Sequence, residues 1–146
     1  RQRQMCIRDR GDTKKIGKTN FDFGNKLATG RKYLVTGIRL LFDTATGNTV
    51  TLSTADYKNT APISFQNGEI VISQTGNGEL LNMPILPFCP KNNVNVVDDE
   101  YTAVIPFTLI DNVETDIMLY QAGAPVTNAA IRVEFDCIEF GEVGRA

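Results

Sequence analysis

The 146 residues suffice for one domain with a hydrophobic core, and 42% hydrophobic with 22% charged residues is an ordinary globular composition. No apolar run approaches the roughly 20 residues of a membrane-spanning helix, and no stretch has the order of a signal peptide. The absence of histidine removes the commonest general base and the commonest zinc ligand.

The net charge of −2 is the sum of two unlike parts. Residues 1–18 hold seven basic and two acidic residues, a balance of +5, and the remaining 128 residues hold eight basic and fifteen acidic residues, a balance of −7. The body therefore repels polyanions, and nucleic-acid binding would depend on the first eighteen residues.

The opening segment, RQRQMCIRDR, is explained by its codons. Gln4 to Asp9 resemble the translation of CAG ATG TGT ATA AGA GAC, the mosaic end of a transposon used to fragment DNA for sequencing. We interpret residues 1–10 as a non-native sequencing artefact in a metagenomic gene, and we expect the true N-terminus to be missing. This interpretation removes Cys6 from the chemistry and leaves only Lys14, Lys15 and Lys18 of the basic start, so no nucleic-acid partner is expected.

Residues 11–30 form an N-terminal extension with glycines instead of a hydrophobic period. Phe21 and Phe23 are spaced to share one face of a short strand. The next segment, residues 32–43, predicts a strand with Leu34, Ile38, Leu40 and Phe42 on one face. Its other face holds Tyr33, Val35, Arg39 and Leu41, so we expect this strand to be covered on both sides over part of its length.

The rest of the chain also alternates with the period of β-strands. Residues 49–54 predict a half-exposed strand, and Asn67-Gly68 predicts a type I′ hairpin joining residues 62–65 to a strand over 69–74. Pro84, Pro87 and Pro90 predict an extended edge or crossing segment. Residues 91–100 predict a loop, and three further strands are predicted over 101–110, interrupted at Pro106, over 114–121 and over 129–140.

The last of these strands places Ile131, Val133, Phe135 and Cys137 on one face, and Arg132, Glu134 and Asp136 on the other. Cys137-Ile138 breaks the alternation and predicts a β-bulge or a two-sided end. Seven or eight short strands without a helical period favour an all-β fold, a single antiparallel β-sandwich over residues 31–146. An immunoglobulin-like sandwich and a jelly roll both fit, and the unequal strands and long connections favour the jelly roll.

No arrangement of residues predicts a catalytic, cofactor-binding or metal site. Asp98-Asp99-Glu100, with Asn92, Asn93 and Asn95, could supply calcium ligands, but without EF-hand spacing we expect a solvated loop that keeps a sheet edge from pairing. Asp111, Glu114 and Asp116 could offer a glycosidase pair, and we expect surface carboxylates instead. We therefore expect no cofactor and no enzymatic activity.

Two further groups of residues bear on chemistry and binding. We expect Cys89 and Cys137 to be buried free thiols, although the fold could still bring them together as a pair. Glycan binding usually uses exposed aromatic side chains, and this chain has four tyrosines: Tyr33, Tyr57, Tyr101 and Tyr120. Tyr57, in a predicted loop, is the one expected to be exposed.

Residues 25–143 resemble small jelly-roll structural proteins of bacterial viruses. The resemblance lies in the order NKLATGRKYLVTGIRLLFDTATG, FQNGEIVISQTGNGELLNMPILPF, YTAVIPFTLIDNVETDIMLYQAG and IRVEFDCIEFGEV. It implies a bacteriophage structural protein, a capsid, vertex or decoration subunit that self-assembles as a homo-oligomer with other virion subunits. A virion location follows, with no membrane partner.

Two other roles stay open on the sequence. The first is an extracellular, pilin-like filament subunit in which residues 11–30 complete a neighbour's sheet. The second is a carbohydrate- or cell-surface-binding module.

Overall fold

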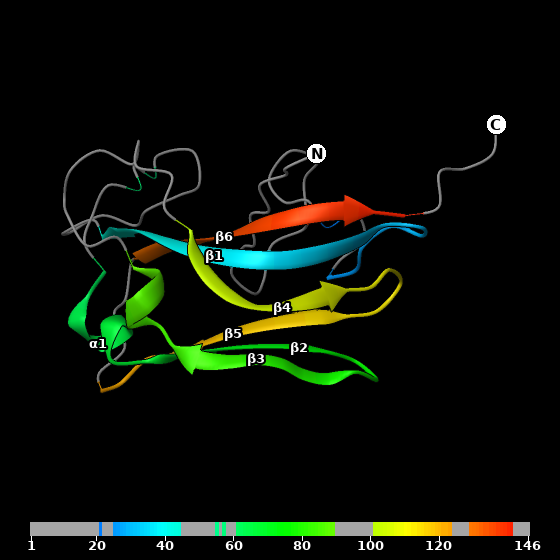
Figure 1. Cartoon of the computed structure of the whole chain (residues 1–146). Helices are drawn as coiled ribbons and strands as arrows, with labels where there is room; N and C mark the ends of the chain where they lie inside the picture. The colour runs from blue at the N-terminus through cyan, green and yellow to red at the C-terminus, as the bar shows by residue number, and fades with distance from the viewer. Residues whose placement is uncertain are drawn as a thin grey trace.

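A computed structural model describes residues 21, 25–44, 55, 57, 61–89, 101–123 and 129–141. These residues form a β-sandwich of two three-stranded antiparallel sheets, one above the other in Figure 1. The upper sheet, sheet A, has the order β4-β1-β6, and the lower sheet, sheet C, has the order β3-β2-β5. The strands are β1 (Lys32–Thr44), β2 (Glu69–Gln74), β3 (Gly78–Pro84), β4 (Thr102–Leu109), β5 (Thr115–Tyr120) and β6 (Ala129–Phe140). The predicted sandwich is confirmed.

Sheet A is built around β1, the strand predicted over 32–43. It pairs with β6 along its whole length, and the register shifts between Val35 and Gly37, where β1 has one extra residue, Thr36. The extra residue turns Tyr33 and Val35 to the same face as Ile38, and all three belong to the core. The predicted grouping of Leu34 with Ile38 was therefore wrong, because a bulge exchanges the two faces of a strand.

The bulge lies in β1 and not in β6. Asp136 and Cys137 on β6 stand opposite it, and β6 continues without an extra residue to Phe140. Cys137 is buried and Ile138 is exposed, so the alternation of β6 also continues. Of the two predicted explanations for the adjacent apolar residues Cys137 and Ile138, the β-bulge is therefore wrong. The strand is regular and has apolar side chains on both faces at its end. The predicted alternation of Val133, Phe135 and Cys137 toward the core is confirmed.

The predicted hairpin at Asn67-Gly68 was wrong. Residues Ile63–Gln66 form the short helix α1, with Gln66 N–H donating to Pro62 O at 3.0 Å, and Asn67 has an ordinary negative φ of −91°. Pro62 precedes the helix with extended backbone, a φ of −57° and a ψ of 148°, and its carbonyl accepts this first bond. The hairpin that does form joins β2 to β3 through residues 75–77, where Gly76 supplies a φ of +86°.

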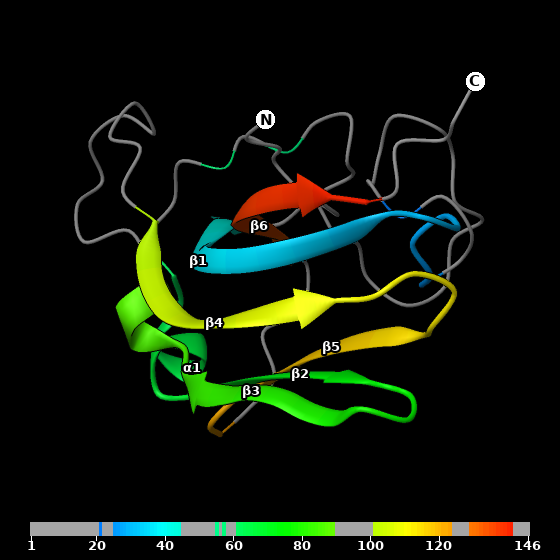
Figure 2. The ribbon, with the colours of Figure 1, turned by 45° about the vertical axis from the view of Figure 1, so that its right-hand side comes forward.

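The proline-rich segment begins as an edge strand, as predicted, but Pro87 lies in a helical turn and not in an extended stretch. β3 lies at one edge of sheet C and ends at Pro84, and a 3₁₀ helix, η1 (Leu86–Phe88), follows it. Pro106 lies in β4, another edge strand, within a stretch where the pairs to β1 jump from Phe107 to Ala103. Proline cannot donate to a ladder, so the irregularity is expected there. Figure 2 shows the bend of β4.

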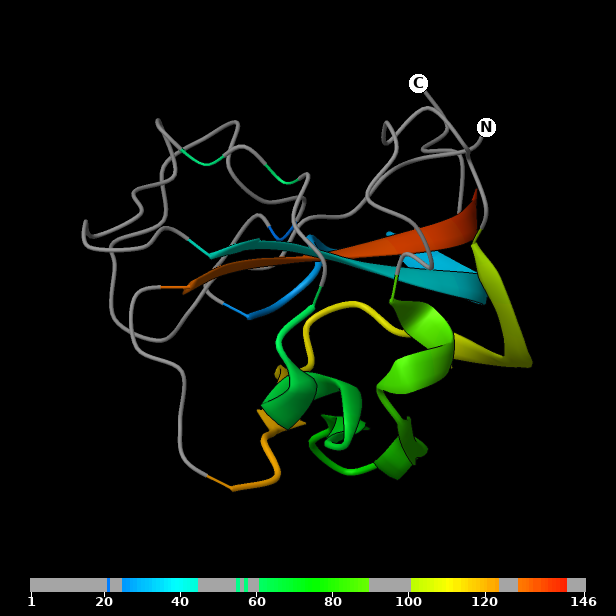
Figure 3. The same cartoon turned by 90° about the vertical axis from the view of Figure 1, so that its left-hand side faces the viewer.

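The core lies between the two sheets. Sheet A contributes Phe42 and Phe135, and sheet C contributes Ile70 and Ile72; all four are fully buried. Phe65 of α1 closes one end of the sandwich, and its ring lies 5.3 Å from that of Phe42. Figure 3 views the molecule from that end, with α1 and η1 in front of the sheets.

Several sequence predictions lie outside the described residues. They are the strand over 49–54, Pro90 and the loop over 91–100, the artefact over 1–10, and Phe23. Phe21 is described, and it is buried in the core. The boundary between residues 30 and 31 falls in a turn in which Arg31 N–H donates to Ala28 O at 3.1 Å.

Candidate functional site

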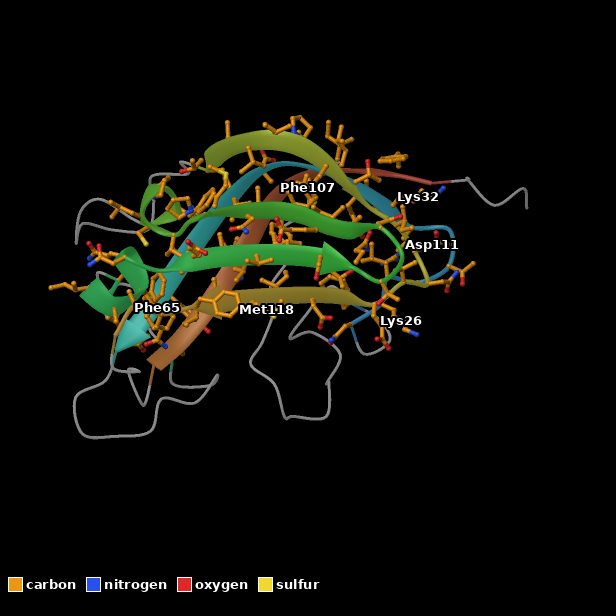
Figure 4. The ribbon with its side chains drawn as sticks, turned by 90° about the horizontal axis from the view of Figure 1, so that it is seen from below. Lys26, Lys32, Phe65, Phe107, Asp111 and Met118 are labelled. Carbon is orange, nitrogen blue, oxygen red and sulfur yellow. The ribbon has the colours of Figure 1, made fainter. Side chains whose placement is uncertain are left out.

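The outer face of sheet C is open to solvent and carries apolar side chains. The strand register places Met118 of β5 beside Val71 of β2, and Tyr120 beside Glu69. Met118 is 39% exposed and Tyr120 is 52% exposed. The Tyr120 hydroxyl donates to Met118 Sδ at 3.4 Å, so the two side chains lie against each other along the strand. Figure 4 shows this sheet from outside, with Met118 on β5.

Two more exposed apolar side chains lie at the end of sheet C near α1. They are Ile63 of α1, 74% exposed, and Leu86 of η1, 54% exposed. Ala122 N–H donates to Ser64 O at 2.8 Å, and Ile85 N–H donates to Gly68 O at 2.9 Å, which holds both short helices next to the sheet. We call Met118 and Tyr120, the two exposed side chains of β5 that contact each other, the apolar patch. Exposed apolar groups that gather on one side of a protein are typical of interaction surfaces.

The opposite end of sheet C is polar. Asp111 Oδ2, in the loop between β4 and β5, accepts from Gly30 N–H at 2.7 Å. Asn112, in a left-handed conformation with a φ of 59°, donates from its N–H to Leu27 O at 3.1 Å. Lys26 bridges to Glu114 in an antiparallel contact, and their charged groups lie 3.7 Å apart. These contacts fasten residues 25–30 to the sandwich, and Figure 4 shows Lys26 and Asp111 together at this end.

The predicted carboxylate triplet is therefore spread over distinct structural roles. Asp111 holds a backbone amide, Glu114 pairs with Lys26, and Asp116 lies within β5 opposite Ser73. Within the described residues, no three acidic or sulfur-bearing side chains gather into a possible metal site. Asp98-Asp99-Glu100 and the neighbouring asparagines lie outside these residues.

The outer face of sheet A contains a buried charged cluster that the sequence did not predict. Glu134 of β6 is 1% exposed, and its Oε2 lies 3.0 Å from Arg39 Nε and 2.5 Å from Arg39 Nη2. Glu134 Oε1 lies 2.8 Å from Arg132 Nε. The Arg39 guanidinium stacks on the Tyr101 ring, 4.7 Å from its centroid. Arg39 within a strongly apolar strand was the available signal, since buried arginine requires an anion.

This cluster shows that β1 is covered on both faces, as the sequence predicted. Leu41 and Asp43 on the outer face are also buried, at 4% and 8% exposure. A Cβ on Gly37 would lie 3.0 Å from Tyr101 Cβ, so Tyr101 packs directly on this face.

The tyrosines lie in four different environments. Tyr33 is buried, Tyr101 covers Arg39, and Tyr57 is half-buried with Arg132 Cζ 5.8 Å from its ring centroid. The expectation that Tyr57 is the exposed one was wrong, because the Arg132 side chain partners its ring. Tyr120 is the exposed tyrosine, and it belongs to the apolar patch.

Cys89 and Cys137 are both buried and both free thiols, as predicted. Burial raises the pKa of the Cys89 thiol from 9.0 to about 11, since an apolar environment disfavours the thiolate. Its Sγ donates to Ile85 O at 3.5 Å. Cys89 is therefore a packing residue with low nucleophilicity.

Comparison with known proteins found no match among protein-family models, curated proteins or solved structures. Among the described residues, neither helix has the length or the apolar character needed to cross a bilayer.

Proposed function

We propose that this chain is a non-enzymatic structural protein of a virus particle, a capsid, vertex or decoration subunit that self-assembles through its β-sandwich. The observation that carries the proposal is the apolar patch on sheet C. Shell subunits associate through complementary surfaces repeated by symmetry, and aromatic and methionine side chains are enriched where such surfaces meet. Met118 and Tyr120 provide both residue types on one exposed strand.

The order of strand pairing supports a jelly-roll-like ancestry for this sandwich. The first described strand pairs with the last, β1 with β6, and the second pairs with the next to last, β2 with β5. A long hairpin folded over on itself produces such nested pairs. The innermost pair departs from this arrangement, because β3 lies in sheet C and β4 lies in sheet A.

Sheet A has exposed apolar residues of its own. Ile138 and Phe140 are exposed near the end of β6, and Ile138 pairs with Leu34 of β1. A subunit with apolar groups on both outer faces can contact neighbours on two sides, which is what a closed shell requires. The proposed location is the virion, with copies of the same chain and other virion proteins as partners.

Self-association of the full chain tests the proposal. We expect light scattering coupled to size-exclusion chromatography to show oligomers whose mass rises with concentration, and electron microscopy to show regular assemblies. Replacing Tyr120 by Ser should shift the equilibrium toward the monomer. The matched control is Ile105→Ser, because Ile105 is 87% exposed on β4, outside the apolar patch. A strictly monomeric wild-type chain at high concentration would refute self-assembly.

A filament subunit is the second candidate, and the fastening of residues 25–30 favours it. The antiparallel bridge from Lys26 to Glu114 leads the N-terminal extension to the edge of sheet C. A neighbour's extension could reach the same edge by strand addition. The gene neighbourhood separates the two roles: terminase or portal genes indicate a virus, whereas usher or sortase genes indicate a filament.

A further inference from the structure

Two backbone hydrogen bonds show which backbone groups of β5 point toward its outer edge, away from β2. Thr75 N–H donates to Glu114 O at 3.0 Å, on the β2 side, and Thr115 N–H donates to Asn25 O at 2.9 Å, on the opposite side. Backbone groups of successive residues point to alternate sides of a strand. The N–H and C=O groups of Ile117 and Leu119 therefore point away from β2, to the free edge.

These groups have no partner among the described residues. β5 is the outermost strand of sheet C, and beyond Thr115 no described backbone group donates to or accepts from Ile117 or Leu119 on that side. An unpaired strand edge is a template for another strand. The edge is also regular, because β5 pairs with β2 over all six residues without a register shift.

The other three edges carry features that disfavour pairing. β3 ends in Pro84 and has a register shift opposite Ser73, and β4 contains Pro106 within its own irregular stretch. β6 carries four charged residues along its length: Arg132, Glu134, Asp136 and Glu139. Prolines, bulges and charges are the devices by which proteins block edge pairing. β5 has no proline or bulge and only Asp116 as a charge.

The sequence of β5 is self-complementary in one antiparallel register. With Met118 opposite Met118 of a second copy, Ile117 faces Leu119 of that copy, and these two are the residues whose backbone groups point to the edge. On the outer face, Asp116 then stands opposite Tyr120 of the second copy, so a carboxylate meets a hydroxyl and no like charges oppose each other. Alternation places Ile117 and Leu119 on the inner, apolar side.

We propose that β5 is the contact between copies of this chain, and that two copies pair β5 to β5 about a twofold axis at Met118 to form one continuous six-stranded sheet. Such an interface is isologous, since each copy offers the same surface. The exposed Met118 and Tyr120 side chains are then covered by their counterparts. This inference rests on the proposed self-assembly and specifies its interface.

Disulfide trapping tests the register. At the axis Met118 is in a non-hydrogen-bonded pair, where the Cα atoms are about 4.5 Å apart, within the range that a disulfide spans. In a full-length Cys6→Ser background, Met118→Cys should give a disulfide-linked dimer on non-reducing gels, reversed by dithiothreitol. The remaining cysteines, Cys89 and Cys137, are buried and do not compete.

Matched variants exclude collisional cross-linking. Asp116→Cys and Tyr120→Cys should each give little disulfide alone, and a mixture of the two should give the heterodimer, because residue 116 meets residue 120 of the second copy. Ile105→Cys, on β4, should give little dimer despite its exposure. Equal cross-linking of Ile105→Cys and Met118→Cys would overturn the proposed pairing.

Different results would refute the proposed self-assembly and the proposed β5 pairing. If the wild-type chain assembles but Met118→Cys gives no disulfide-linked dimer, the β5 pairing is wrong and self-assembly stands. If the wild-type chain is monomeric at every concentration, both are wrong. A dimer that forms through Met118→Cys in solution supports both.

Discussion

Replacing Glu134 by Gln is expected to destabilise the fold by about 3–5 kcal/mol, the usual cost of removing one partner from a buried ion pair. Glu134 is 1% exposed, and Arg39, whose guanidinium binds it through two nitrogens, is 7% exposed. A glutamine keeps the shape and a hydrogen-bond acceptor but leaves the positive charge of Arg39 buried with weaker compensation. The penalty therefore comes mainly from desolvated charge and not from lost packing.

The second arginine in this cluster provides an internal comparison. The Arg132 side chain is 34% exposed, and solvent screens its interaction with Glu134. We expect Arg132→Ala to cost only about 0.5–1 kcal/mol, the range for a partly solvated pair. The difference between the losses in free energy of unfolding of Glu134→Gln and Arg132→Ala measures how much of the Glu134→Gln loss comes from the buried charge of Arg39.

Urea denaturation followed by far-ultraviolet circular dichroism measures these free energies of unfolding. The double variant Arg39→Met, Glu134→Leu should recover most of the loss, because apolar replacements of similar volume remove both charges together. The reasoning would be refuted by a Glu134→Gln variant within about 1 kcal/mol of wild type. It would also be refuted if the loss of the double variant equalled the sum of the losses of Arg39→Met and Glu134→Leu measured singly.

Two further predictions concern single positions. Gly68 is close to Tyr120 O, which would lie 1.9 Å from an added Cβ, so Gly68→Ala and Gly68→Asn should both cost about 1–3 kcal/mol in urea denaturation. Gly76, with a φ of +86° and open space around it, should accept Asn at a cost of about 0.5 kcal/mol. If asparagine cost the same at Gly68 and Gly76, the close approach of Tyr120 O to Gly68 would be refuted and a type I′ turn at Gly68 would again be the better interpretation. The Cys89 thiol, with its pKa raised to about 11, should be alkylated by iodoacetamide with a midpoint near that pH, as followed by peptide mass spectrometry; a midpoint near 9 would contradict its burial. Because the unfolded thiol ionises from about pH 9, its contribution to stability is present below that pH and is lost as the pH rises toward 11.

Local patterns in the sequence were sufficient for the strands that alternate regularly. β2, β5 and β6 begin and end within two residues of their predicted bounds, because one side of each strand is buried and the period of two is visible in the side chains. Pro84 also indicated an edge position correctly, since the lack of an N–H excludes proline from a regular central strand. The sequence favoured buried free thiols at Cys89 and Cys137, and the fold then showed that these two residues do not pair.

Other features depend on contacts between residues far apart in the chain. The bulge at Thr36 exchanges the faces of β1, and only its pairing with β6 reveals the extra residue. Asn67-Gly68 has the composition of a tight hairpin, yet Gly68 is needed because the carbonyl of Tyr120 approaches it from another strand. Glu134 and Arg132 face outward by alternation, but the burial of Glu134 and the stacking of Tyr101 on Arg39 come from packing on the outer face of sheet A.

The same distinction holds for the candidate interface. The sequence alone indicated a mostly β fold, a strand over residues 114–121, and the alternation of Met118 and Tyr120 with Ile117 and Leu119, because side-chain periodicity is a local property. Only the tertiary structure decided that this strand lies at an edge, with Met118 and Tyr120 toward solvent and with no described backbone group paired to Ile117 or Leu119 on the side away from β2. Strand order depends on which distant segments pair, and the alternation of side chains within one strand carries no information about its neighbours.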